Sequence, residues 1–250
     1  MFDLSGRVAL VSGGSRGIGR ARAEGFAASG AEVIVASRRK DACGEVASAI
    51  EQAGGKAIAM QCHAGKLDEI EALFGDITSR FGRLDVLVNC GATNPFFGLI
   101  GDTEPSVFDK TIEVNLRGPF FMSAHAVKLM RPRGSGSIIN VASINGISPG
   151  LFQGIYSITK AALINMTKSF ALEYGSDGIR VNALLPGLTD TKLASALTKN
   201  PEHLQPFLDK IALHRVAQPE EMVGAAIYLA SDAYSYTTGA TQVVDGGATI

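Results

Sequence analysis

The sequence predicts a doubly wound α/β fold, in which one parallel sheet of seven strands carries helices on both faces. Short β-branched runs alternate with longer segments of helical periodicity along the 250 residues. The strand candidates are apolar almost throughout, which is typical of parallel sheets covered on both faces. No repeat, low-complexity tract or linker interrupts the alternation, so we expect a single domain over residues 1–250.

The elements follow one another in a regular order. The expected strands are Val8–Ser12, Glu32–Ser37, Lys56–Gln61, Leu84–Val88, Ser137–Ala142, Arg180–Leu184 and Thr241–Val244. The expected helices are Ile18–Ala28, Asp41–Gln52, Leu67–Phe81, Glu104–Met130, Gly154–Tyr174 and Pro219–Leu229. The polar stretch Pro186–Val216 is interrupted by Pro201 and Pro206, and we expect a mobile, irregular insertion on the substrate side at about 187–214.

Composition excludes several classes of function. The net charge of −1 is too small for the basic field that binds nucleic acid or an anionic membrane. The longest apolar runs fall far short of the roughly 20 residues that span a bilayer, and we expect no signal peptide at the N-terminus. Three cysteines without a close pair, Cys43, Cys62 and Cys90, indicate neither a disulfide framework nor a zinc site. We expect a cytoplasmic protein that holds no metal.

The first strand runs into a glycine-rich turn that precedes a helix. Glycines at this point let the backbone approach a pyrophosphate, and the helix N-terminus supplies N–H donors with a partial positive charge. An ordinary tight turn between a strand and a helix has a similar composition, so the loop alone is a weak signal. The candidate cofactor contacts in it are Gly13, Ser15, Arg16, Gly17, Ile18 and Gly19.

The end of the second strand indicates which cofactor is bound. A carboxylate that binds the ribose of NAD is expected roughly 20 residues after the loop. Here the strand ends instead in Ser37, Arg38 and Arg39, and Arg16 already lies in the loop. Guanidinium groups bind phosphate through charge-assisted, often bidentate hydrogen bonds. The sequence therefore predicts NADP(H), whereas Lys40 fits a solvated helix start.

A second group of residues carries reactive side chains. Tyr156 and Lys160 are four apart and share one helical face, although a pair of this kind arises by chance in roughly one sequence in five. Ser143 closes an apolar strand 13 residues before Tyr156. Asn115 lies within an expected helix, where asparagine is a mediocre helix former and needs another reason to be present.

Taken together, these motifs resemble the classical short-chain dehydrogenase/reductase family over essentially the whole chain. Asn115, Ser143, Tyr156 and Lys160 match its catalytic tetrad, and the loop resembles its T-G-x-x-x-G-I-G with Ser12 in place of Thr. Further matches are Pro186, Gly187, Thr189 and Thr191, which the family places against the nicotinamide, and the C-terminal Val244, Asp245, Gly246 and Gly247. The resemblance implies a Rossmann-type sheet ordered 3-2-1-4-5-6-7 and a homotetramer.

Two departures from the family pattern concern the cofactor. The family's N-N-A-G is here Asn89, Cys90, Gly91 and Ala92. Asn89 is kept, so we expect its strand-stabilising role to survive, and Asn89 and Gly91 are candidate cofactor contacts, although 90–92 depart from the family's pattern. His63, followed by Ala64, replaces the usual Asp beside the adenine. With the segment 94–98, this variation most resembles the branch of NADPH-dependent carbonyl/retinal reductases.

The resemblance implies a hydride transfer assisted by Tyr156 as proton donor or acceptor. A cation about 6 Å away, at an effective dielectric of about 20, stabilises a phenolate by roughly 2.8 kcal/mol, so Lys160 is expected to lower the tyrosine pKa towards neutrality while burial opposes it. Ser143 would hydrogen-bond the substrate oxygen, and Asn115 would hold a water that links Lys160 to solvent.

We expect an NADP(H)-dependent oxidoreductase that acts on a small ketone, aldehyde or secondary alcohol, most simply a carbonyl reductase. An NAD-linked alcohol, sugar or steroid dehydrogenase and a 3-oxoacyl-carrier-protein reductase remain open alternatives, and a non-catalytic nucleotide-binding redox sensor is a remote one. The apolar residues Phe96, Phe97, Leu151, Phe152 and Leu188 fit the core and a pocket wall equally well.

Overall fold

The computed structural model, which describes residues 1–198 and 201–250, contains the expected doubly wound sheet. Its order is β3-β2-β1-β4-β5-β6-β7 and every neighbouring pair is parallel, which confirms the predicted order and fold class. The strands are β1 (Val8–Ser12), β2 (Glu32–Ser37), β3 (Lys56–Gln61), β4 (Val86–Asn89), β5 (Gly136–Val141), β6 (Ile179–Pro186) and β7 (Thr241–Val244).

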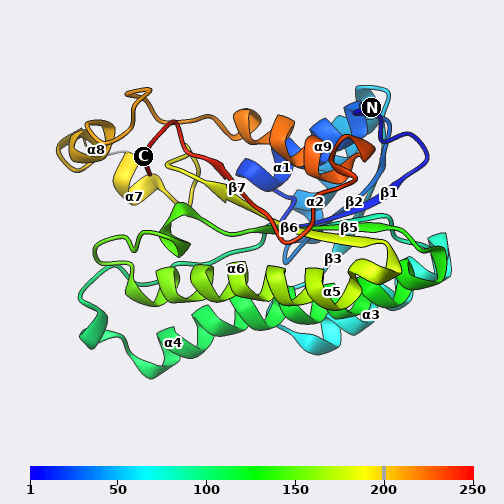
Figure 1. Cartoon of the computed structure of the whole chain (residues 1–250), viewed down its shortest axis with the longest axis horizontal. Helices are drawn as coiled ribbons and strands as arrows, with labels where there is room; N and C mark the ends of the chain where they lie inside the picture. The colour runs from blue at the N-terminus through cyan, green and yellow to red at the C-terminus, as the bar shows by residue number, and fades with distance from the viewer. Residues whose placement is uncertain (199–200) are drawn as a thin grey trace.

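Helices cover both faces of the sheet (Figure 1). One face carries α1 (Gly17–Ala28), α2 (Lys40–Gln52) and α9 (Val223–Ala230), and the other carries α3 (Leu67–Phe81), α4 (Pro105–Ile112), α5 (Gly118–Met130) and α6 (Gly154–Tyr174). Each strand therefore serves two cores: on β1, Leu10 packs towards α3, α5 and α6, whereas Ala9 and Val11 pack towards α1, α2 and α9. This is why the central strands are apolar on both faces.

The prediction of one continuous helix over Glu104–Met130 is wrong in one respect. A π-helical turn, η2 (Glu113–Arg117), separates α4 from α5. Such a turn accommodates one more residue than an α-helical turn and is frequent at functional sites. It contains Asn115, whose side chain points inwards and is completely buried. The unusual helical asparagine thus marks an interruption of the α-helix.

The segment 187–214 also differs from the expected irregular insertion. It contains α7 (Ser195–Thr198) and α8 (Pro201–Leu208), while 199–200 lie outside the described residues. Pro201 begins α8, where its missing N–H has no helical partner in any case. Pro206 lies inside α8, where it removes one backbone hydrogen bond without ending the helix.

The remaining helical segments are short. They are η1 (Ile100–Asp102), η3 (Arg131–Arg133), η4 (Ile144–Gly146), η5 (Gly175–Asp177), η6 (Pro219–Met222) and η7 (Asp232–Tyr234). The expected helix Pro219–Leu229 is divided between η6 and α9. No helix in the described part of the chain is both long and apolar enough to cross a membrane.

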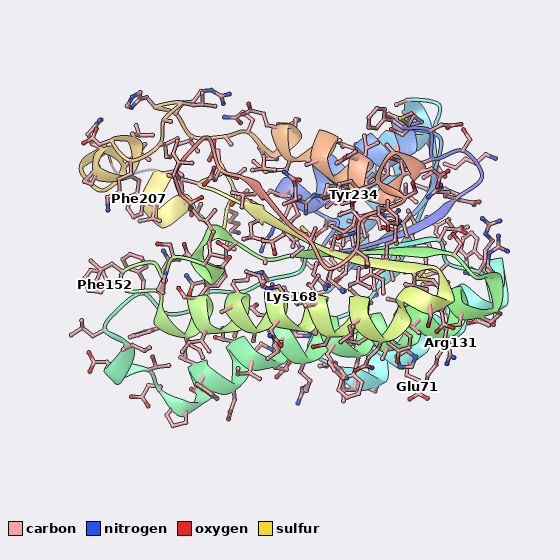
Figure 2. The ribbon with its side chains drawn as sticks, viewed as in Figure 1. Glu71, Arg131, Phe152, Lys168, Phe207 and Tyr234 are labelled. Carbon is pink, nitrogen blue, oxygen red and sulfur yellow. The ribbon has the colours of Figure 1, made fainter. Side chains whose placement is uncertain are left out.

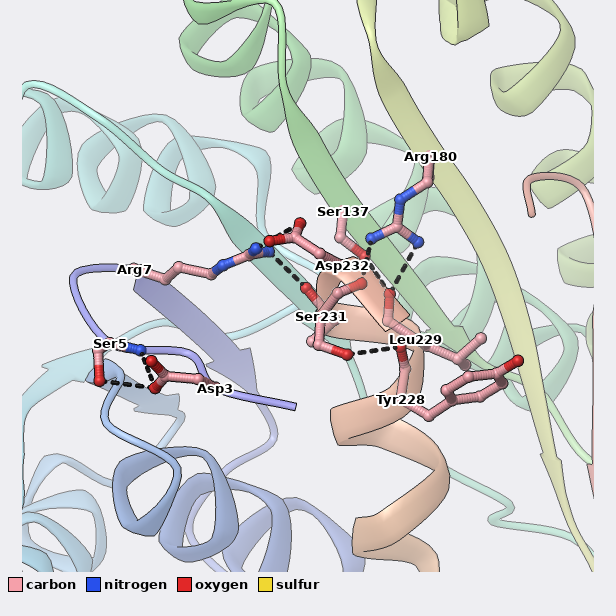
Figure 3. A network of polar contacts seen from close by, with 10 residues as sticks. Asp3, Ser5, Arg7, Ser137, Arg180, Tyr228, Leu229, Ser231 and Asp232 are labelled. Carbon is pink, nitrogen blue, oxygen red and sulfur yellow. Dashed lines mark hydrogen bonds and ion pairs between the residues drawn. The ribbon is translucent and has the colours of Figure 1, made fainter. Parts of the chain in front are cut away.

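A polar network joins α9 to the strands at the end of the sheet opposite the candidate site (Figure 3). Arg180 donates to the backbone oxygens of Leu229 and Ser231, and Ser137 donates to Leu229 as well. Arg7 completes the network with a hydrogen bond to Ala230 O and an ion pair with Asp232. These contacts satisfy the carboxyl end of α9 and fix it on the sheet.

Candidate active site

The candidate residues gather at the carboxyl ends of the central strands. Ser12 at the end of β1 lies beside Asn89 of β4, which lies beside Asn140 of β5. Figure 2 shows the side chains of Phe152 and Phe207 at one end of the molecule, far from Arg131 at the other. In doubly wound sheets, ligands bind beyond the carboxyl ends of the strands.

Three candidate catalytic side chains meet there. Tyr156 and Lys160 lie in the first two turns of α6, with Lys160 Nζ 5.5 Å from the centre of the Tyr156 ring. Lys160 Nζ also donates to Val141 O over 2.8 Å, at the end of β5. Ser143 follows two residues later, and its hydroxyl faces the Tyr156 phenol. The structure therefore brings together a proton donor, a cation and a hydroxyl.

Burial controls the charge of this group. It raises the pKa of Tyr156 to about 12, and the Ser143 hydroxyl only partly offsets this effect. It also lowers the pKa of Lys160 to about 8. The expectation of a phenol pKa near neutrality is therefore not met by the protein groups alone, because loss of hydration outweighs the hydrogen bond with Ser143. At neutral pH the phenol carries its proton.

Asn115 holds three elements together. Its Oδ1 accepts a hydrogen bond of 2.8 Å from the backbone N–H of Thr93, and its Nδ2 donates to Thr93 O over the same distance. Nδ2 also donates to Thr159 Oγ1, which in turn donates to Tyr156 O. The side chain thus ties the π turn to the loop after β4 and to α6. Its expected role in holding a water remains a prediction.

Asn89 belongs to a buried polar chain beneath the site. Its Nδ2 donates to Asn140 Oδ1 over 2.9 Å and to Ser123 Oγ over 3.1 Å. Asn140 Nδ2 donates in turn to Thr167 Oγ1 on α6. The chain links α5, β4, β5 and α6, which agrees with a strand-stabilising role of Asn89, and its expected contact with the cofactor remains a prediction.

The glycine-rich turn has the geometry that a pyrophosphate needs. Gly13 has a φ of +72°, and a methyl group on it would lie 2.7 Å from the Cα and N of Gly91. Gly17 has a φ of +51°, and a methyl group on it would lie 3.3 Å from Thr191 Cγ2. Among the described residues, no side chain caps the N-terminus of α1 at Arg16, and its first turn carries no acidic group. Its N–H groups are thus free to bind an anion.

The end of β6 closes the site from the other side. A methyl group on Gly187 would lie 2.7 Å from Asp245 Cα, so the backbone after Pro186 runs directly against the end of β7. Thr189 is buried, and its hydroxyl donates to Gly187 O. Thr191 Oγ1 accepts from Ala194 N at the edge of the insertion. These residues lie beyond the carboxyl end of β6, and the hydroxyls of Thr189 and Thr191 form local hydrogen bonds; their expected contact with the nicotinamide remains a prediction.

The edge near β2 is basic. Arg16, Arg38 and Arg39 are exposed, and none of them has an ion-pair partner in the described part of the chain. His63 lies close by: burial lowers its pKa, and Lys110 and Arg38 lower it further. The hydroxyl of Ser37 contacts Arg39 O and Cys43 Sγ, so its expected contact with a phosphate would require a change of partner.

Comparisons with known proteins agree with this geometry. A family model described as enoyl-(acyl carrier protein) reductase matches residues 13–249. Dehydrogenase/reductase SDR family member 4 of Oryctolagus cuniculus is 36% identical over 245 residues, which cover 98% of this chain and 94% of the relative. The chain belongs to the short-chain dehydrogenase/reductase family. Proteins of this family are oxidoreductases that act on CH–OH or C=O groups with a nicotinamide cofactor.

Solved structures of short-chain dehydrogenases/reductases match the whole fold. A short-chain type dehydrogenase/reductase from Mycobacterium marinum has a TM-score of 0.93 at 36% identity, covering 99% of this chain and 97% of that one. A gluconate 5-dehydrogenase from Burkholderia cenocepacia J2315, solved with NADP and tartrate, has a TM-score of 0.96 at 31% identity and covers 99% and 97%.

Sequence reasoning missed one pair beside the site of this short-chain dehydrogenase/reductase. Arg22 on α1 is completely buried and donates from Nη1 to Cys90 Sγ over 3.5 Å. An arginine four residues after Ile18, on the buried face of the first helix, was the available signal. The three cysteines do not come together with histidines or carboxylates as metal ligands in any cluster that the described residues form.

Proposed function

We propose that this short-chain dehydrogenase/reductase is an NADP(H)-dependent carbonyl reductase. The observation that carries the proposal is the meeting of Ser143, Tyr156 and Lys160 at the carboxyl end of β5. The nicotinamide supplies the hydride when it is bound. Tyr156 donates its proton to the developing alkoxide, and Ser143 donates a hydrogen bond to the same oxygen.

The protonation state of Tyr156 favours the reductive direction. With a pKa of about 12, the phenol is protonated at neutral pH and is ready to act as an acid. Alcohol oxidation needs the phenolate instead, which burial makes costly. We therefore infer that ketone reduction is faster than alcohol oxidation near pH 7.

The basic edge supports NADP(H) as the cofactor. Arg16 and Arg38 are exposed cations near the ends of β1 and β2, and no Asp or Glu stands at 36–38 to accept a bond from a free 2′-hydroxyl. Both guanidinium groups would bind a 2′-phosphate through charge-assisted hydrogen bonds. The solved Burkholderia cenocepacia relative contains NADP, which agrees with this assignment.

The mouth of the site favours an apolar substrate. Phe97 and Phe152 stack edge to face with ring centres 5.6 Å apart, and Gly98 N donates to Phe152 O. Phe152 has a φ of +62°, a conformation that is costly for a bulky residue and marks a constrained position. Both rings remain substantially exposed, as do Leu99 and Leu151. Such a surface suits an aromatic or aliphatic ketone.

A sugar-acid dehydrogenase is the second candidate, because a solved relative is named a gluconate 5-dehydrogenase. A polyol would require polar groups at the mouth, where this chain presents Phe97 and Leu151. A 3-oxoacyl-carrier-protein reductase needs basic residues around the mouth, and Lys192 and Lys210 form no dense patch, while Lys199 lies outside the described residues. A redox sensor without turnover has no need of the tetrad.

The test is oxidation of NADPH and NADH, followed optically, with aromatic ketones, diketones, quinones, retinoids, 5-ketogluconate and acyl thioesters. We expect turnover of at least one apolar carbonyl compound with NADPH. Turnover confined to 5-ketogluconate would support the sugar-acid dehydrogenase instead. Nucleotide binding without turnover of any of these compounds would support the sensor.

A further inference from the structure

Arg22 on α1 is the largest side chain that the structure buries completely. Its Nη1 lies 3.5 Å from Cys90 Sγ, while Nε and Nη2 have no hydrogen-bond partner among the described residues. Burial lowers the pKa of the guanidinium, but arginine remains charged in proteins. A buried charge is costly unless an opposite charge lies beside it.

Cys90 is the described residue whose side chain contacts this charge. In the part of the chain that the structure describes, it is the one ionisable residue that acts on the pKa of Arg22, and it acts to raise it. No described carboxylate forms an ion pair with Arg22. Cys90 follows β4 directly and is partly exposed. A thiolate next to arginine is the usual setting of a reactive cysteine.

We propose that the buried guanidinium of Arg22 activates the sulfur of Cys90, and that Cys90 is a modification site for soft electrophiles beside the active site. The reaction is a substitution. The sulfur attacks the CH₂ carbon of a haloacetamide, a C–S bond forms, the carbon–halogen bond breaks, and the halide leaves with the electron pair. No oxidant is required.

The other two thiols lie in a different environment. Cys43 and Cys62 are buried, and burial raises the pKa of both, that of Cys62 to about 12. They are therefore protonated at neutral pH and unreactive. The three cysteines thus provide an internal comparison within one protein.

Modification of Cys90 would also change the pKa of Lys160. Cys90 raises the pKa of Lys160 and Arg22 lowers it, so the two members of the pair act in opposite directions on the same ammonium. Alkylation blocks the sulfur and leaves the guanidinium in place. The site therefore senses electrophiles at a position from which the charge of Lys160 is altered.

The first test is alkylation by iodoacetamide at pH 7, with each cysteine followed by peptide mass spectrometry. We expect rapid labelling of Cys90 and none of Cys43 or Cys62. Because an ordinary thiol is only a few per cent ionised at pH 7, Arg22→Met should slow labelling of Cys90 by about tenfold. The matched control Arg20→Met, on the exposed face of the same helix, should leave the rate within twofold. A rate unchanged by Arg22→Met overturns the proposal.

The second test measures the coupling by thermal unfolding. Cys90→Ser leaves the charge of Arg22 without its partner, so Tm should fall. Arg22→Met introduced into the Cys90→Ser protein should raise Tm again, and by more than it changes Tm in the wild type. If the two changes in Tm simply add, the side chains carry no mutual charge interaction and the proposal is wrong.

Discussion

Lys160 lies one helical turn after Tyr156, with its Nζ 5.5 Å from the centre of the tyrosine ring, and both side chains are buried. Burial acts on them in opposite directions, because it favours the neutral form of each. It raises the pKa of the phenol and lowers that of the ammonium. At pH 7 the phenol is therefore neutral and ready to donate its proton, while the ammonium, with a pKa of about 8, still carries most of its charge.

Replacement of Tyr156 by Phe removes the proton donor and little else. We expect kcat to fall by about 10²–10⁴-fold, while the dissociation constant of NADPH stays within about threefold of the wild-type value. Steady-state kinetics and fluorescence titration measure the two quantities. Tyr236→Phe, at a fully exposed tyrosine, serves as the control. Retention of more than a tenth of the activity in Tyr156→Phe would show that another group is the acid.

The lowered pKa of Lys160 makes a prediction about stability and pH. Between pH 8 and 10.5 the unfolded chain binds more protons at this lysine than the folded one, so its contribution to folding stability rises with pH. From pH 7.5 to 9.5 the rise is about 2 kcal/mol. Urea unfolding of wild type and Lys160→Met at both values should show the rise only in wild type. Lys168→Met, at an exposed lysine of the same helix, should behave like wild type.

Arg38→Ala should weaken the binding of NADPH but not that of NADH. Hydrogen bonds to charged groups contribute about 1.5–3 kcal/mol, so the KM for NADPH should increase by roughly ten- to a hundredfold, while the KM for NADH hardly changes. Lys40→Ala, at the neighbouring exposed cation, should change neither value. An equal increase in KM for both cofactors, or a wild type that prefers NADH, would show that Arg38 is only a solvated residue at the start of a helix and does not bind the 2′-phosphate.

Two glycine substitutions should have opposite effects. Gly13→Ala puts a side chain at a positive φ and against the backbone of Gly91, so it should lower the free energy of unfolding by more than about 2 kcal/mol and abolish the stabilisation by NADPH. Gly75 lies inside α3 with open space around it, and Gly75→Ala should raise stability by about 0.5–1 kcal/mol. Urea unfolding with and without NADPH measures both.

We also expect the chain to form a homotetramer. Phe108 on α4, Phe120 and Phe121 on α5 and Leu172 on α6 are exposed, although they lie on apolar helices. Exposed apolar faces of this kind mark interfaces between subunits. Light scattering at micromolar concentration should give four times the chain mass. Leu172→Glu should reduce that mass, whereas Leu67→Glu, at the start of α3, should leave it unchanged.

Regular patterns were predicted well and local geometry was not. The helix Leu67–Phe81 has the predicted bounds because its apolar period and its terminal glycine, Gly82, agree. The π turn around Asn115 was missed, since its cause is a set of contacts with Thr93 and Thr159 from elsewhere in the chain. The helix that contains Pro206 was missed because proline usually ends a helix.

In the candidate site, too, some features could be predicted from the sequence and others could not. The residue types and their place at the strand ends followed from the sequence, because parallel strands bring their carboxyl ends to one edge. The raised pKa of Tyr156 could not be predicted from the sequence, because it depends on burial, and the spacing of residues along the chain does not reveal burial. The contact between Arg22 and Cys90 depends on how α1 lies over β4, and no local pattern encodes that.

The contact of Gly13 with Gly91 bears on how the protein acquires its site during folding. β1 pairs with β4, so the two loops meet only after the chain has closed a long excursion through α1, β2, α2, β3 and α3. A nascent chain that ends before residue 84 contains the whole glycine-rich turn but none of the backbone against which it rests. Nucleotide affinity therefore requires the nonlocal pairing of β1 with β4, and it can arise only after the chain has passed residue 91, although its signature stands at the start of the sequence.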